Sequence, residues 1–94
     1  MHNRCVEFEF DPVKSAANLQ KHGIDLNTAQ ALWLDTGLII LPSRYDDEPR
    51  FLAIGRIGSQ HWTAVFTERG DTVRLISVRR SRDNEKEVYE QNQS

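Results

Sequence analysis

The sequence from Arg50 to Arg80 reads RFLAIGRIGSQHWTAVFTERGDTVRLISVRR and holds three extended segments separated by two short turns. The segments are residues 50–57, 60–67 and 72–78. Their β-branched and aromatic residues favour strands. Gly58-Ser59 suits a two-residue type II′ hairpin, and Arg69-Gly70-Asp71 suits the next turn. The sequence therefore predicts an antiparallel meander of three strands.

The residues at the start of the chain predict a strand and a helix. Residues 6–10, VEFEF, alternate apolar and acidic side chains, as in a strand with one buried face. Asp11-Pro12 is a strong helix start, and Gly23 is expected to end that helix. The polar stripe of the helix consists of Lys14, Asn18 and Lys21. The apolar residues that we expect to face the core are Val13, Ala16, Ala17 and Leu19.

A second helix is expected to begin near Asp25 or Asn27 and to end by Gly37. Its buried seam should consist of Ala29, Leu32 and Trp33. Residues 38–41 predict the next strand. The polar segment 42–49 is bounded by prolines and predicts an exposed loop.

A last helix is expected over residues 83–92, capped by Ser81 or Asp83. Val88 and Tyr89 are its only sizeable apolar residues, so it should bury little surface and dock lightly. The order β-α-α-β-β-β-β-α predicts an α+β fold. This fold would be a mainly antiparallel sheet with two N-terminal helices and one C-terminal helix, all on one face.

Length and composition narrow the class of protein. Ninety-four residues suit one domain. No apolar run approaches the roughly 18 residues of a membrane span, and the N-terminus lacks the apolar core of a signal peptide, so we expect a cytoplasmic protein without membrane contact. The single cysteine, Cys5, cannot form an internal disulfide. Cys5 and the three histidines fit no metal-ligand spacing, so we expect no metal and no other cofactor.

The net charge of −2 hides a segregation of charge along the chain. Residues 1–49 carry −4, residues 50–82 carry +5 and residues 83–94 carry −3. All seven basic residues of the central block are arginines. Such a block indicates a localised anion site. A solvated, arginine-rich sheet face explains it equally well.

Several motifs in this order resemble the BrnT family of toxins. The N-terminal motifs are EFEFDP at 7–12, Lys14, Asn18 and KHGI at 21–24. The later motifs are RFLAIG at 50–55, VRLISVRR at 73–80 and Tyr89. The resemblance spans residues 6–90. The sequence departs from many relatives in its acidic last helix, with Glu85, Glu87 and Glu90 where more arginine is usual.

This resemblance implies a single RelE-like toxin domain over residues 1–94. It also implies an endoribonuclease whose cleavage of RNA inhibits translation. The expected partner is a BrnA-like antitoxin with a ribbon-helix-helix domain, so that operator DNA is bound only through the toxin-antitoxin complex. Two alternatives remain open, a non-catalytic nucleic-acid-binding subunit and a regulatory subunit that only binds an antitoxin.

A metal-free ribonuclease needs cationic groups that stabilise the charge developing on the phosphate, and arginine suits this role. The candidates are Arg74, Arg79 and Arg80. Arg74 and Arg80 are an even number of residues apart on the last strand, so their side chains are expected on the same face of the sheet. By resemblance to RelE-like proteins, Arg79 or Arg80 contacts the scissile phosphate. A surface ion pair is the alternative role for each.

The reaction also needs a group that accepts the proton of the ribose 2′-hydroxyl. Glu68 is the first choice because it and Asp71 are the only carboxylates within the basic block, although Glu68 can equally pair with Arg50 or Arg74. His22 is the second choice, since an imidazole exchanges protons near neutral pH. A cation at a helix C-terminus is the alternative role for His22.

Four further residues are candidates for RNA binding, namely Lys21, Arg50, Arg56 and Tyr89. Tyr89 can stack on a base or, alternatively, anchor the last helix against the sheet. Trp62 can offer a base platform, but we expect it to be mainly buried.

Overall fold

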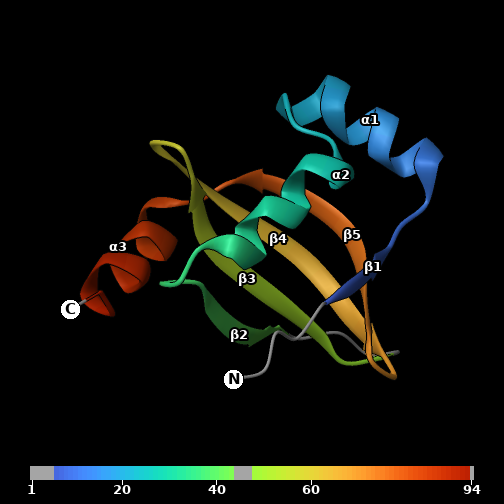
Figure 1. Ribbon diagram of the computed structural model, residues 1–94. Coiled ribbons are helices and arrows are strands. Elements are labelled where there is room, and N and C mark those ends of the chain that lie inside the picture. The colour runs from blue at the N-terminus through green and yellow to red at the C-terminus, as the bar shows by residue number, and fades with distance from the viewer. Residues whose placement is uncertain (1–5, 44–47, 94) are drawn as a thin grey trace.

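The computed structural model describes residues 6–43 and 48–93 and shows one five-stranded sheet with three α-helices (Figure 1). The elements are β1 (Glu7–Glu9), α1 (Pro12–His22), α2 (Leu26–Ala29), the 3-10 helix η1 (Gln30–Leu34), β2 (Ile39–Ser43), β3 (Arg50–Ile57), β4 (Gln60–Arg69), β5 (Thr72–Arg80) and α3 (Asp83–Gln91). The strand order is β1-β5-β4-β3-β2, and only β1 pairs in parallel, with β5. The α+β class is confirmed. Residues 44–47 of the expected loop lie outside the described residues.

The central meander is confirmed. Ile57 pairs with Gln60, which leaves Gly58-Ser59 as a two-residue hairpin loop, and Gly58 has a φ of 63°. Arg69 pairs with Thr72 around Gly70, whose φ is 62°. Both turns need the left-handed backbone that glycine adopts without a steric cost.

Helix α1 begins and ends as expected but presents the opposite face to the core. The Asp11 side chain accepts the N–H of Val13 at 2.9 Å, and Gly23 ends the helix in the left-handed conformation. The buried residues of α1 are Ser15 and Asn18, whereas Val13 is 76% exposed and Leu19 is 49% exposed. Ala16 and Ala17 are exposed as well. The predicted core face of this helix is therefore wrong.

The reason for this reversal lies at the outer edge of β5. Strand β1 pairs only with residues 72–74 of β5, so the edge beyond them needs other hydrogen-bond partners. The Asn18 amide supplies them, because it donates to the Val78 carbonyl at 2.8 Å and accepts the Val78 N–H at 3.1 Å. Asn18 also donates to the Ile24 carbonyl at 2.8 Å. The Asn18 side chain thus makes the two backbone hydrogen bonds to Val78 that a neighbouring strand would otherwise make, and it fixes α1 along β5.

Helix α2 and η1 cover one face of the sheet (Figure 1). The expected second helix is split into these two short elements, but its seam is packed as predicted. Ala29 and Leu32 are fully buried, and the Trp33 ring packs edge-on between Phe8 and Phe66. Asp25 caps α2 by accepting the N–H of Thr28 at 2.7 Å.

A bulge in β5 changes which side chains share a face. Val65 pairs with Ser77 and Phe66 pairs with Leu75, so one extra residue of β5, Ile76, has no partner in β4. An extra residue reverses the alternation of side chains. Arg80 therefore lies on the face of Trp62, while Arg74 lies on the opposite face with Thr67. The expectation that Arg74 and Arg80 share a face is wrong.

Helix α3 lies at the end of the sheet away from α1 (Figure 1) and docks through buried polar contacts. It contacts Thr63, which points to the opposite face from Ala64 in the core beneath α2 and η1, so the helices do not all lie on one face. Its N-cap is Arg82, whose N–H donates to Glu85 at 2.8 Å, whereas the Ser81 hydroxyl lies 2.8 Å from that of Thr63. The prediction of a cap at Ser81 or Asp83 is thus wrong, and the polar contacts of α3 were not predicted.

Candidate nucleic-acid interface

Cationic and aromatic side chains gather where β3 ends, β4 begins and β5 ends. Arg56 lies opposite His61 on the sheet face that carries α3, and Trp62 lies opposite Arg80 on the face that carries α2 and η1, so the two pairs meet at the same end of the sheet from its two faces. The guanidinium carbon of the exposed Arg80 is 5.7 Å from the centroid of the Trp62 ring, a cation–π contact that orients it. We call Arg56, His61, Trp62 and Arg80 the strand-end surface.

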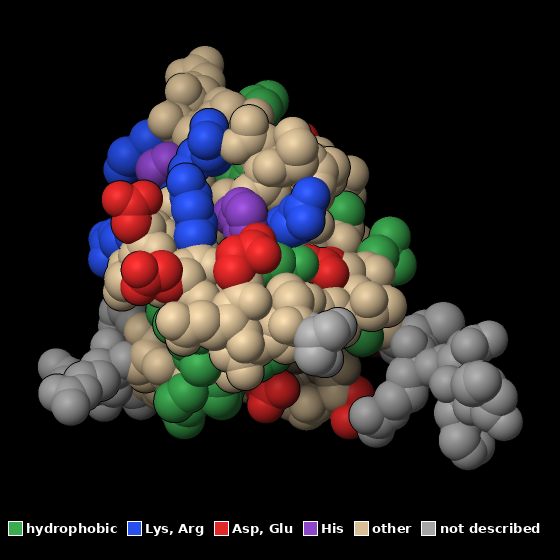
Figure 2. Space-filling model, turned by 90° about the vertical axis from the view of Figure 1, so that its left-hand side faces the viewer, with side chains coloured by type: hydrophobic (Ala, Val, Ile, Leu, Met, Phe, Trp, Pro, Cys, Tyr) green, Lys and Arg blue, Asp and Glu red, His purple; other side chains and the backbone are tan. Residues whose placement is uncertain are grey.

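Both described histidines and several basic side chains appear together on the face that Figure 2 shows. His22 is the last residue of α1, about 6 Å along the helix beyond Asn18. Arg80 lies a similar distance along β5 beyond Val78, the partner of Asn18. The Asn18 contact therefore places His22, with the exposed Lys21 beside it, toward the Arg80 end of β5.

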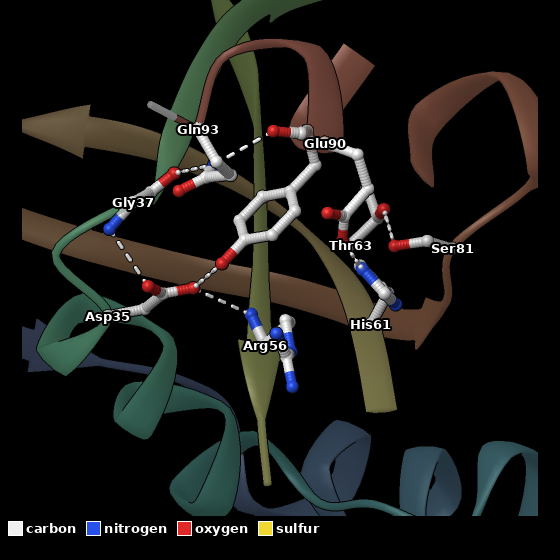
Figure 3. A network of polar contacts seen from close by, with 9 residues as sticks. Asp35, Gly37, Arg56, His61, Thr63, Ser81, Glu90 and Gln93 are labelled. Atoms are coloured by element: carbon white, nitrogen blue, oxygen red, sulfur yellow. Dashed lines mark hydrogen bonds and ion pairs between the residues drawn. The ribbon is translucent and has the colours of Figure 1, made fainter. Parts of the chain in front are cut away.

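His61 is held in a defined orientation by α3. Its Nε2 lies 2.8 Å from a carboxylate oxygen of Glu90, and its ring meets the Tyr89 ring edge-on at 5.2 Å (Figure 3). The side chain of His61 is 18% exposed. A hydrogen bond at Nε2 leaves Nδ1 as the nitrogen that can exchange a proton with a substrate.

Tyr89 and Asp35 tie α3 to η1 behind this histidine. The Asp35 carboxylate accepts hydrogen bonds from the Tyr89 hydroxyl at 2.7 Å and from the N–H groups of Arg56 and Gly37 at 2.8 Å each (Figure 3). Burial disfavours the ionised form of Asp35, but these bonds outweigh burial and lower its pKa. Burial and the contact with Asp35 raise the pKa of Tyr89 to about 12. Tyr89 is nearly fully buried and ties α3 to Asp35, which leaves its ring little surface for stacking on a base.

Arg79 is engaged by a buried carboxylate. Its guanidinium donates to both oxygens of Glu85, at 2.8 and 2.9 Å, and the Thr63 hydroxyl donates to the same carboxylate at 3.0 Å. Burial disfavours the ionised form of Glu85, yet these donors lower its pKa to about 2. Arg79 therefore links β5 to α3, and Arg80 is the open arginine of the pair.

An open pocket of about 400 Å³ adjoins the strand-end surface beside Arg56. Its walls include Leu34, Ile57 and Tyr89, and Asp35 lies among its lining residues. Leu34 is highly exposed at the pocket. An apolar wall next to a cationic side chain can accommodate the base and phosphate of a nucleotide.

Three other candidates lie at the far end of the sheet. Glu68 pairs with Val73 and Arg79 pairs with Thr63, which separates Glu68 from Arg79 by roughly 17 Å at about 3.3 Å per residue. Arg74 forms an ion pair with Glu9 at 3.1 Å. Arg50 is the first residue of β3, so it lies at the end of that strand away from Arg56. The structure thus does not bring Glu68, the first-choice base, together with Arg79 and Arg80. Neither Arg50 nor Arg74 is its ion-pair partner among the described contacts.

Glu68 instead lines a separate pocket of about 520 Å³ with Asp71 and Trp33. The two carboxylates among the lining residues disfavour a phosphate in this pocket. Within residues 6–43 and 48–93, no three His, Cys, Asp or Glu side chains are grouped so that they could hold a metal ion. No helix of the described residues is both long and apolar enough to cross a membrane.

A family model described as "Ribonuclease toxin, BrnT, of type II toxin-antitoxin system" matches residues 10–85. The chain belongs to the BrnT family. Membership makes it a ribonuclease toxin of a type II toxin-antitoxin system, and an antitoxin is its partner. Comparison with curated proteins gives no match.

The BrnT match covers the whole sheet except β1, and it ends within α3 at Glu85. His22, His61, Arg79 and Arg80 therefore lie inside the matched region, whereas Tyr89 and Glu90 lie beyond it. The contact between His61 and Glu90 thus joins a residue of the matched region to one outside it. Positions beyond Glu85 carry no information from the family match.

Two residues of this candidate interface, His61 and Glu90, were not predicted from the sequence as site residues. His61 stands next to Trp62 in a strand, and only the hairpin register shows that it faces Arg56. Glu90 is 29 residues away, and its contact with His61 depends on how α3 docks. The usable signal was the two-residue turn at Gly58-Ser59, because it fixes the register and so places Arg56 opposite His61.

Proposed function

We propose that the chain is a metal-independent endoribonuclease with a RelE-like fold and that the strand-end surface is its active site. The observation that carries the proposal is the oriented His61, held by Glu90 at 2.8 Å and flanked by Arg56 across the hairpin. A positioned histidine with a carboxylate behind it is an arrangement suited to general acid–base catalysis.

In this mechanism His61 removes the proton from the ribose 2′-hydroxyl. The 2′-oxygen then bonds to phosphorus, the bond from phosphorus to the 5′-oxygen breaks, and the leaving 5′-oxygen takes a proton from His22. The products are a 2′,3′-cyclic phosphate and a 5′-hydroxyl end. The Glu90 carboxylate stabilises the imidazolium that forms on His61.

Arg80 stabilises the negative charge that builds up on the phosphate oxygens. Its guanidinium is exposed and already oriented by Trp62, so it needs little reorganisation to meet an anion. Arg56 and Lys21 bind the flanking phosphates, and the pocket beside Leu34 takes a neighbouring base. Arg79 keeps a structural role through Glu85, and this mechanism leaves Glu68, Arg74 and Arg50 outside the site.

By the resemblance of the sequence, the toxin acts in the cytoplasm and inhibits translation by cutting RNA. The antitoxin is BrnA-like and carries a ribbon-helix-helix domain that brings the complex to operator DNA. The family membership supports a cognate antitoxin, and the cationic strand-end surface supports RNA as the ligand.

Cleavage of a defined RNA by the purified protein tests this proposal. We expect cleavage to persist in excess EDTA and to leave 2′,3′-cyclic phosphate ends. His61→Gln should lower the cleavage rate at least 100-fold. Glu68→Gln, at the other end of β4, is the matched control and should cleave as the wild type does. Loss of cleavage in Glu68→Gln together with full activity in His61→Gln would move the site to the far end of the sheet.

A further inference from the structure

The outer face of α1 is mostly apolar although it faces solvent. Its exposed stripe consists of Val13, Ala16 and Ala17, with Gln20 at its C-terminal end and Leu19 along one edge. The polar residues Ser15 and Asn18 point inward instead, where Ser15 accepts the Leu26 N–H at 2.9 Å. A helix on the surface of a domain normally shows the reverse arrangement. Isolated exposed apolar residues are ordinary, but a helix that turns its apolar side outward indicates a binding face.

The charges on α1 indicate what covers this face. Lys14 and Lys21 are seven residues apart, so they lie on the same edge of the apolar stripe, and both are exposed. No carboxylate lies within residues 12–22. A partner that fits must therefore combine apolar side chains with carboxylates along one side.

A second copy of the chain does not have this chemistry at α1. An antiparallel symmetric contact between two α1 helices would set Lys14 and Lys21 against the same lysines of the other copy. A parallel symmetric contact would leave both lysine edges without a carboxylate, because residues 12–22 contain none. RNA does not fit either, because Val13, Ala16 and Ala17 offer no hydrogen-bond donor and no ring for stacking. The partner required by a type II toxin-antitoxin system is an antitoxin.

We infer that the outer face of α1 docks the antitoxin, through an amphipathic segment whose apolar residues cover Val13, Ala16 and Ala17 and whose carboxylates pair with Lys14 and Lys21. The stripe serves as the apolar centre of a larger contact, since one helix of eleven residues is smaller than a standard interface. Lys21 and His22 end α1, so a bound segment that continues past them approaches the strand-end surface.

Two substitutions test this docking without disturbing the helix. Val13→Asp places a carboxylate in the first turn, where the helix dipole favours it, and Ala16→Glu places one on the exposed stripe at a position whose neighbour four residues later is Gln20, not a lysine. Ile40→Glu is the matched control, because Ile40 is 44% exposed on β2 at the opposite edge of the sheet. The probe is the purified product of the neighbouring antitoxin gene, titrated into the full-length toxin.

We expect both α1 variants to bind this antitoxin at least tenfold more weakly, while Ile40→Glu stays within twofold of the wild type. Amide hydrogen exchange of the wild-type complex should slow in residues 12–22. The RNA-cleavage rate of the free variants should equal that of the wild type, so the result is independent of the proposed catalytic site. Unchanged affinity together with unchanged exchange in α1 would overturn the inference. A loss of RNA binding, or of a wild-type homodimer, in place of a loss of antitoxin binding would also overturn it.

Discussion

The ion pair between Glu85 and Arg79 should be the largest single polar contribution of α3 to stability. The Glu85 side chain is 8% exposed and receives both guanidinium hydrogen bonds. Substituting Glu85→Gln keeps the shape and one acceptor oxygen but removes the charge. Arg79 is then left with a neutral amide as its partner at this position, which is costly for a partly buried cation.

The magnitude follows from the pKa of Glu85, which is lowered from 4.5 to about 2. Each unit by which the pKa is lowered corresponds to about 1.4 kcal/mol, so the lowering at Glu85 corresponds to about 3 kcal/mol in the free energy of unfolding at neutral pH. Because the pKa is lower in the folded state, the contribution is fully present above pH 4.5 and is lost as the pH falls toward 2. Glu85→Gln should therefore be about 3 kcal/mol less stable than the wild type at pH 7 and nearly as stable near pH 2.

Urea unfolding of both proteins between pH 7 and pH 2 measures this difference directly. Subtracting the two curves at each pH removes the contributions of the other carboxylates, which both proteins share. Glu87→Gln is the control, because Glu87 is exposed on the same helix and should change stability by less than about 0.5 kcal/mol. A difference between wild type and Glu85→Gln that stays constant from pH 7 to pH 2 would refute the assigned ion pair.

Three further outcomes follow from the site geometry. Arg80→Ala should lower kcat/KM for RNA cleavage by 100- to 1000-fold, about 3 kcal/mol, whereas Arg74→Ala, toward the other end of β5, should change it less than threefold. Glu90→Gln should lower kcat more than it raises KM, because it removes the charge behind His61, and single-turnover kinetics separate the two effects. Tyr89→Phe should cost about 1 kcal/mol in urea unfolding, and this cost should persist to pH 10 and disappear as the pH passes about 12.

The elements with local signals were predictable from the sequence. Asp11-Pro12 and Gly23 bound α1, and Gly58-Ser59 closes the β3–β4 hairpin, because capping and turn geometry depend on residues close in sequence. The orientation of α1 was not predictable in this way. Its apolar stripe satisfies the usual rule for a core face, but the unpaired edge of β5 selects Asn18 instead.

The bulge in β5 shows why the site was harder to predict than the fold. Side chains alternate between the two faces of a regular strand, so Arg74 and Arg80, six residues apart, would share a face. One residue of β5 without a partner in β4 reverses the alternation and places them on opposite faces. Nothing in the local sequence marks Ile76 as that residue. The strand-end arginines were therefore predicted from the basic block and the family resemblance, whereas His61, the group that can act with them, came only from the register.

The acidic residues of the last helix have partners that only the tertiary structure shows. In sequence, Glu85 and Glu90 follow a basic strand and form part of the acidic last helix that departs from many relatives. In the structure each carboxylate has a cationic or titratable partner, Arg79 for Glu85 and His61 for Glu90. Their charges are thus directed toward groups of the toxin itself, where they hold α3 in place and orient an imidazole. The exposed cation left at the strand end, Arg80, then faces its ligand without a carboxylate among its described ion pairs.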